Sequence, residues 1–82
     1  MNREEVYEQL TRVFRDVFDN EDITINDNTT ADDIDEWDSM EYINLIMAVE
    51  EEFSIKFTME QVNGMKNVGE MVGLIIEKVK VD

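Results

Sequence analysis

The sequence contains no cysteine, no histidine and no proline. Without cysteine the chain has no disulfides and no thiol nucleophile, and without histidine it lacks a usual zinc ligand and the commonest general base. Paired carboxylates could still support glycosidase-like hydrolysis, but that chemistry needs a deep cleft, which a domain of 82 residues seldom forms. We therefore expect a protein that is not an enzyme and that has no metal site of its own.

The chain also lacks a long hydrophobic run and a basic start followed by an apolar stretch. Nothing in it therefore marks membrane insertion or secretion, and we expect a cytoplasmic location. A length of 82 residues with 43% hydrophobic content suffices for one compact core but not for two. The sequence thus predicts a single domain over residues 1–82, and we expect a monomer.

Basic residues are missing from a large part of the chain. The 21 acidic and 7 basic residues leave a net charge of −14, and residues 16–55 hold 14 of the acids and none of the bases. A negative surface of this kind repels nucleic acids and anionic membranes and attracts basic protein surfaces. Acidic stretches are also often no more than solubilising faces, so charge alone leaves both interpretations open.

Four helix starts are predicted by a polar residue followed three positions later by Glu or Gln, a spacing that lets two side chains satisfy first-turn amides. Apolar residues at helical spacing follow each start. We expect helices over residues 3–18, from the Asp38 cap through an apolar stripe that extends to Phe53, over 59–63 and over 68–80, with Gly64 ending the third in the left-handed conformation. The predicted fold is all-α, a small four-helix bundle of three longer helices and one short helix. The pairs are Asn2/Glu5, Asp38/Glu41, Thr58/Gln61 and Asn67/Glu70.

A long loop, residues 19–37, joins the first two predicted helices. Ile23, Ile25 and Ile34 are expected to anchor it on the bundle, and an additional helical turn is possible over residues 30–34. Trp37 and Tyr42 flank the predicted Asp38 cap at the spacing of a hydrophobic staple, which orients the chain as it enters a helix.

Ser39 follows the predicted cap directly. Because Asp38 already serves as the cap, the Ser39 hydroxyl is expected to be free at the first helical position. The positive end of the helix dipole would favour a phosphate attached there by about 0.3–1 kcal/mol. An Asp-Ser pair taken alone, however, is most often only a good helix start.

The sequence around this pair resembles the acyl carrier protein family. The resemblance rests on Asp38-Ser39-Met40, on residues 41–48 and 50–53, and on Val68-Gly69-Glu70. It implies that Ser39 carries a 4'-phosphopantetheine arm, whose thiol holds acyl or aminoacyl groups as thioesters for presentation to partner enzymes. It also implies that Asp38 helps to hold the metal ion used when a phosphopantetheinyl transferase delivers the arm from coenzyme A.

The same resemblance implies that the second helix is the face read by acyl-loading and acyl-transfer enzymes with basic docking patches. Two residues depart from the family pattern: Met40 replaces the usual Leu, and Asn44 replaces a common acid. A tryptophan before the motif, here Trp37, is more similar to the pattern of specialised stand-alone carriers than to that of fatty acid synthesis. The partner-binding residues so implied are Met40, Glu41, Asn44, Met47, Glu50 and Glu51.

Five internal methionines predict a flexible interior that could admit an acyl chain between helices two, three and four. They are Met40, Met47, Met59, Met65 and Met71. For each methionine taken singly, ordinary core packing is the favoured explanation. The alternative function is an unmodified acidic helical module that binds a basic partner, which would not need Ser39. The expected acyl-pocket residues are Ile43, Ile46, Met47, Val62, Met65, Met71 and Ile75.

Overall fold

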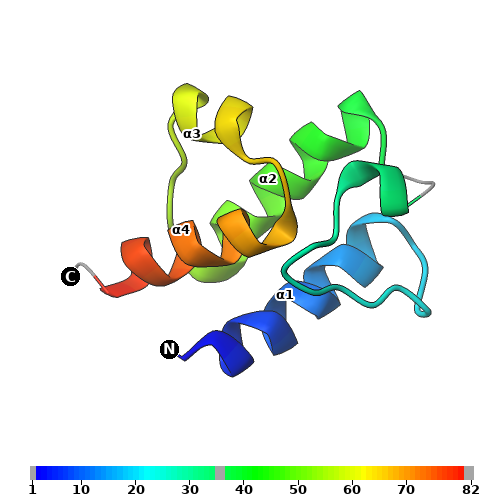
Figure 1. The fold of residues 1–82 in the computed structure, drawn as a ribbon, viewed down its shortest axis with the longest axis horizontal. Coiled ribbons are helices and arrows are strands. Elements are labelled where there is room, and N and C mark those ends of the chain that lie inside the picture. The colour runs from blue at the N-terminus through cyan, green and yellow to red at the C-terminus, as the bar shows by residue number, and fades with distance from the viewer. Residues whose placement is uncertain (1, 35–36, 81–82) are drawn as a thin grey trace.

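The computed structural model describes residues 2–34 and 37–80, and within them every regular element is helical. The elements are α1 (Arg3–Val17), the 3-10 turn η1 (Ala31–Asp33), α2 (Ser39–Phe53), α3 (Met59–Gly64) and α4 (Val68–Lys80) (Figure 1). This arrangement confirms the expected all-α bundle with one short helix and a long loop after the first.

The helices begin where the capping pairs predict. Asn2 and Thr58 each accept a hydrogen bond from the amide three residues on, and the side chain of that residue accepts one from the amide of the cap. At the start of α4, Asn67 Oδ1 accepts from the Glu70 amide at 2.9 Å, whereas the Glu70 carboxylate accepts from the Lys66 amide at 3.3 Å. The reciprocal half of this last pair is therefore shifted by one residue.

The prediction for Gly64 was wrong. Gly64 is the last residue of α3 and does not have a positive φ, and Met65 after it is extended with φ −75° and ψ 117°. The chain leaves α3 directly into an extended connection, so no left-handed residue is needed there. The left-handed residues are Asp19, with φ 51°, and Ser54, which caps α2 with φ 54°.

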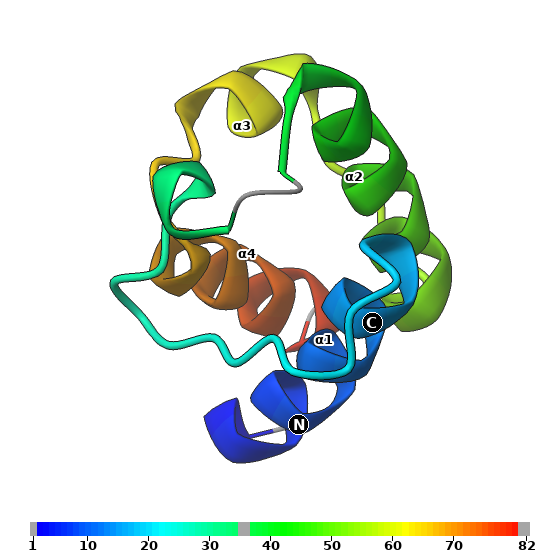
Figure 2. The ribbon, with the colours of Figure 1, turned by 90° about the vertical axis from the view of Figure 1, so that its right-hand side faces the viewer.

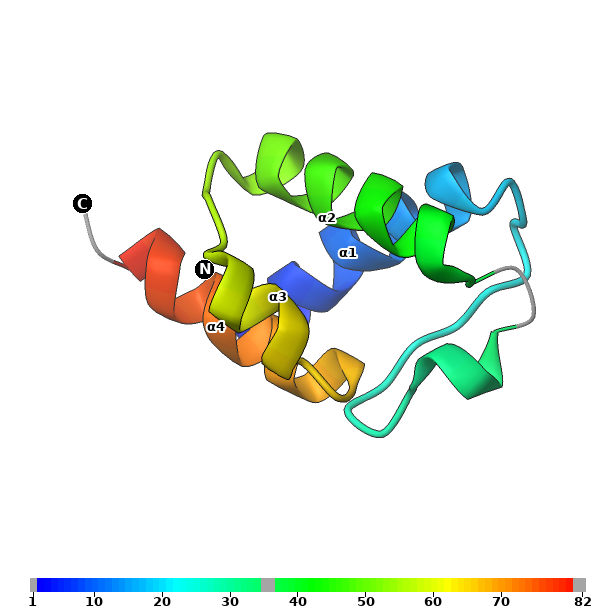
Figure 3. The same ribbon diagram turned by 90° about the horizontal axis from the view of Figure 1, so that it is seen from above.

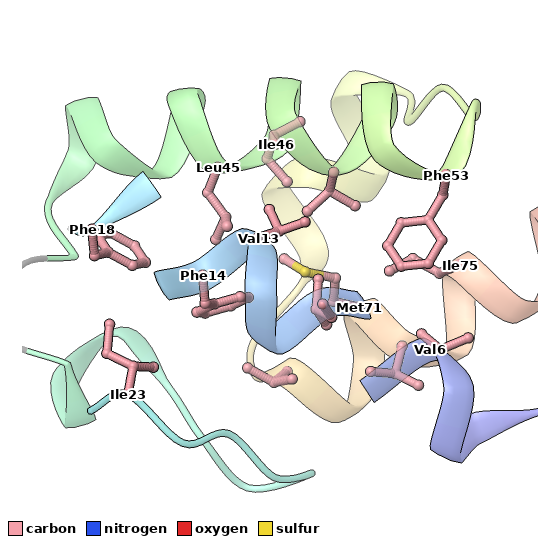
Figure 4. Close-up of a cluster of buried hydrophobic side chains, with 14 of the residues drawn as sticks. Val6, Val13, Phe14, Phe18, Ile23, Leu45, Ile46, Phe53, Met71 and Ile75 are labelled. Atoms are coloured by element: carbon pink, nitrogen blue, oxygen red, sulfur yellow. The ribbon is translucent and has the colours of Figure 1, made fainter. Parts of the chain in front are cut away.

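The core lies around α1, which packs against both α2 and α4. Figure 3 shows α2 along one side of the molecule and α4 along the other, and Figure 4 shows Phe14 and Val13 of α1 directed between them. Because α3 contributes no buried residue, it covers the bundle without belonging to its centre. The side chains that are 0% exposed are Val6, Leu10, Phe14, Leu45, Val49, Val68, Val72 and Ile75.

The loop between α1 and α2 is anchored by the isoleucines that the sequence singled out. Ile23 and Ile34 are buried and Ile25 is half-buried against the core, which confirms their predicted role. The Arg15 Nε group also donates to the Ile23 carbonyl at 2.9 Å. The turn η1 falls within the predicted residues 30–34.

Farther along, the loop lies against the first turn of α4 (Figure 2). The Val68 amide donates to the Thr29 carbonyl at 2.8 Å, and the Gly69 amide donates to the Asp27 carbonyl at 3.1 Å. Both amides belong to the first turn of α4, which has no acceptors within its own helix. Thr29 is buried, and its Oγ1 accepts from the Asn26 amide at 2.9 Å, which holds the loop in this shape.

Asp27 also ties the loop to α1. Its carboxylate lies 2.5 Å from the Arg3 guanidinium and accepts a hydrogen bond from the Tyr7 hydroxyl. The hydrogen bond from Tyr7, followed by that from Arg3, lowers the pKa of Asp27 below its ordinary value. Partial burial, together with the bond to Asp27, raises the pKa of Tyr7 to about 12.

Two glycines of α4 provide a matched test of the contact between the loop and α4. A Cβ on Gly69 would lie 2.8 Å from the Asp27 carbonyl oxygen, whereas a Cβ on Gly73 would meet nothing within 4 Å. Gly69→Ala should therefore destabilise the fold by about 1–3 kcal/mol, and Gly73→Ala should stabilise it by about 0.5–1 kcal/mol. Urea unfolding measures both, and two changes of the same sign would contradict the contact.

The tie between Tyr7 and Asp27 predicts a pH dependence. Because the pKa of Tyr7 is higher in the folded state than the unfolded value of about 10, the stability gained from this hydroxyl is complete below that pH and is lost as pH rises toward about 12. The gap in unfolding free energy between wild type and Tyr7→Phe should therefore narrow over this range. Thr11→Val is the control, because it removes a hydroxyl that does not titrate, and its difference in unfolding free energy from the wild type should not change with pH. If the difference for Tyr7→Phe is equally constant, the predicted effect is refuted.

Candidate functional site

The site begins at the first turn of α2. Asp38 Oδ1 accepts from the Glu41 amide at 2.9 Å, and the Asp38 carbonyl accepts from the Tyr42 amide at the same distance. Ser39 follows the cap as the first residue of a 15-residue helix. Since Asp38 supplies the cap, this position does not require the serine hydroxyl for helix initiation. The first amides of a helix and its dipole favour an anionic group here.

An aromatic cluster holds the start of α2 against α1. The Trp37 ring lies 6.0 Å from the Tyr42 ring between centroids, which confirms the predicted hydrophobic staple. Trp37 also meets Phe14 edge-on at 5.4 Å and lies 6.0 Å from Phe18, two contacts that the sequence did not predict. The backbone on either side of the Asp38 cap is thereby fixed by tertiary packing as well as by the cap itself.

Tyr42 makes a second connection, to α3. Its hydroxyl donates to the Val62 carbonyl at 2.5 Å, and half-burial raises the pKa of this hydroxyl. The last carbonyls of a helix have no acceptor role within that helix. Tyr42 therefore satisfies a carbonyl of the short α3 and joins it to the first turn of α2.

A cavity of about 370 Å³ opens beside the first turn of α2. Its wall includes Asp38, the residue before Ser39. Apolar and aromatic side chains line most of it, and polar groups come from the connection between α3 and α4. A flexible organic arm attached at Ser39 therefore has room to fold back between η1 and that connection. The lining residues are Ala31, Trp37, Asp38, Tyr42, Met65, Lys66, Asn67 and Met71.

The seven residues expected to form an acyl pocket are not brought together. Met65 and Met71 line this cavity. Ile46, Val62 and Ile75 lie in or against the core. Ile43 and Met47 are exposed on α2. The sequence did not indicate Tyr42, Lys66 or Asn67 as lining residues, because helical spacing does not show which side chains border a cavity.

The outer face of α2 carries a row of exposed apolar side chains. Met40 is 77% exposed, Ile43 61% and Met47 62%. Met40 and Met47 were expected at a partner-binding face, and Ile43 joins them although the sequence suggested a pocket. Their spacing of three and four residues gives one helical stripe, and this stripe is the signal by which Ile43 could have been found.

The acidic residues of α2 differ in their surroundings. The Glu50 carboxylate is half-buried and accepts from the Phe57 amide at 2.8 Å, which holds the connection to α3. Glu41, also half-buried, accepts from Asn44 Nδ2 at 3.2 Å. Glu51 and Glu52 are exposed. Of the residues expected to bind partners, Glu50 thus has a structural contact, while Glu52, which was not expected there, is accessible.

The described part of the chain has neither a cluster of metal ligands nor a membrane-spanning helix. Residues 2–34 and 37–80 contain no group of three or more acids that could hold a metal ion. Over the same residues, no helix is long and apolar enough to cross a membrane.

Comparison with known proteins identifies the family of the chain. Residues 8–75 match the family described as the phosphopantetheine attachment site. Acyl carrier proteins from Petrotoga mobilis and Clostridium perfringens are 32% and 34% identical, over 100% and 88% of this chain and 96% and 95% of their own lengths.

A solved structure gives the same result. The solution structure of a holo acyl carrier protein from Geobacter metallireducens matches with a TM-score of 0.86 and 39% identity, covering 90% of this chain and 85% of that one. The chain therefore belongs to the acyl carrier protein family and is a carrier that bears 4'-phosphopantetheine.

Proposed function

We propose that Ser39 carries the 4'-phosphopantetheine arm, on which the chain holds acyl or aminoacyl groups as thioesters and presents them to partner enzymes. The observation that carries this proposal is the position of Ser39, which follows an Asp38 cap already bonded to the Glu41 amide. The arm supplies the thiol, which a chain without cysteine cannot provide. The chain is a carrier and not an enzyme.

The residues around Ser39 have separate tasks in this function. Asp38 holds the first turn of α2, whose amides and dipole favour the phosphodiester of the arm. Trp37 and Tyr42 fix the direction of that turn. The adjacent cavity offers the arm a place out of solvent.

Partner enzymes dock on α2 in this proposal. Two kinds of contact are available there: the apolar row of Met40, Ile43 and Met47, and the acids Glu41 and Glu51. Basic patches on a phosphopantetheinyl transferase and on acyl-handling enzymes would meet these acids, and the net charge of −14 would speed the encounter. The monomeric state, the cytoplasmic location, the absence of nucleic-acid and membrane binding, and a specialised pathway stay predictions. The family match disfavours an unmodified interaction module.

Replacement of Ser39 tests the attachment site. Ser39→Ala should abolish the mass gain that follows incubation with coenzyme A and a promiscuous transferase, while helical content and melting temperature change little because Asp38 provides the cap. Ser54 is the other serine and has φ 54°, so Ser54→Gly suits its backbone and should leave loading intact. Intact-mass spectrometry decides: an arm on Ser39→Ala protein would disprove the assignment.

Charge reversal on α2 tests the docking face. Glu41→Lys with Glu51→Lys should raise the KM of the transferase several-fold at low salt and less at high salt, because salt screens exposed charges. Glu77→Lys, one charge reversal on an exposed residue of α4, is the matched control for Glu51→Lys alone and should have little effect. A separate variant, Glu50→Lys, should lower the melting temperature, because it removes the carboxylate that accepts a hydrogen bond from the Phe57 amide. If the α2 variants and Glu77→Lys have the same transferase KM as the wild type at low salt, the result would argue against docking on α2.

A further inference from the structure

Tyr42 forms part of the wall of the cavity beside Ser39. Trp37 lines the same cavity, as does Met71, which is only 1% exposed. The volume of about 370 Å³ is near the lower end of the roughly 300–1,000 Å³ of small-molecule pockets. Because the arm itself would share this volume, the space left for the group that it carries is small.

Two interactions hold the Tyr42 ring in this wall. The hydroxyl donates to the Val62 carbonyl at 2.5 Å, and the ring lies 6.0 Å from that of Trp37. Its backbone amide is bonded to Asp38 in the first turn of α2. To swing out of the way, the ring would have to give up the bond to α3 and the contact with Trp37. Tyr42 is therefore a fixed part of the wall.

The region between α2 and α4 is filled by core side chains. Ile46 of α2 is 7% exposed, while Leu45 of α2 and Val72 and Ile75 of α4 are 0% exposed. Figure 4 shows Leu45 and Ile46 pointing from α2 toward the side chains of α1 and α4. A long alkyl chain could enter this region only by displacing packed side chains, which costs free energy.

We propose that Tyr42 limits the length of the acyl group that the cavity can shelter, so that the carrier is built for short acyl groups and not for long alkyl chains. The occupant is the group on the chain's own arm, because the cavity wall includes Asp38, the residue before the proposed attachment point. This inference rests on the proposed function of Ser39. It makes Tyr42 a determinant of cargo specificity.

The test compares acyl groups of increasing length on the full-length protein. A promiscuous transferase loads it from acetyl-, butyryl-, octanoyl- and hexadecanoyl-coenzyme A, and mass spectrometry follows thioester cleavage by hydroxylamine. Acetyl and butyryl thioesters should be cleaved several-fold more slowly than the same thioesters of free pantetheine, because the cavity shields them. Octanoyl and hexadecanoyl thioesters should be cleaved at nearly the rate of the free compounds.

Three variants assign the limit to the ring. Tyr42→Ala should protect the octanoyl thioester several-fold, because removal of the ring enlarges the cavity. If circular dichroism shows that Tyr42→Ala does not fold, Tyr42→Leu replaces it, since Leu retains apolar bulk without the outer part of the ring. Tyr42→Phe is the matched control: it loses only the hydroxyl and should retain the preference of the wild type.

The outcomes separate the two proposals. If no acyl group can be loaded, both the attachment site and the length limit are overturned. If loading succeeds but all lengths are equally protected or equally exposed, only the length limit fails. If Tyr42→Ala and Tyr42→Leu both show the wild-type preference, the ring does not set the limit.

Discussion

The contact between the long loop and the start of α4 is the constraint on which the arrangement of the site depends. Thr29 and Asp27 supply their carbonyls to the first-turn amides of α4, and Gly69 allows the approach because a side chain there would collide with Asp27. The same loop is tied to α1 through the Asp27 carboxylate. Since η1 and Trp37 come later in this loop, its position sets one wall of the cavity beside Ser39.

The start of α2 is supported by interactions of different range. The bond from the Glu41 amide to Asp38 is local, and it leaves the following serine without a capping role. The contacts of Trp37 with Phe14 and Phe18 are long-range and couple this turn to α1. The proposed attachment residue thus follows a cap that is itself held firmly, so that an arm there would move while its point of attachment keeps one orientation.

The acidic residues of α2 show why net charge is a poor guide to individual roles. Glu50 accepts the Phe57 amide and stabilises the chain between α2 and α3, whereas Glu51 next to it is exposed. Both contribute equally to the charge of −14. The negative field that attracts basic partners belongs to the surface as a whole, while the Glu50 carboxylate also has a structural task that Glu51 does not share.

The sequence by itself determined the helices and the capped first turn of α2, because capping and amphipathic spacing act within a few residues. The starts at Asn2, Asp38, Thr58 and Asn67 all appear in the structure. It also identified the loop anchors, since isolated isoleucines in a polar segment have little reason to face water. Only the tertiary structure decided the form of the cavity and the division of apolar residues between interior and surface. Ile43 and Ile46 look alike in the sequence, yet the first is 61% exposed and the second 7%. The bond from Tyr42 to Val62 and the approach of Gly69 to Asp27 depend on how distant segments pack, and no local pattern encodes that packing.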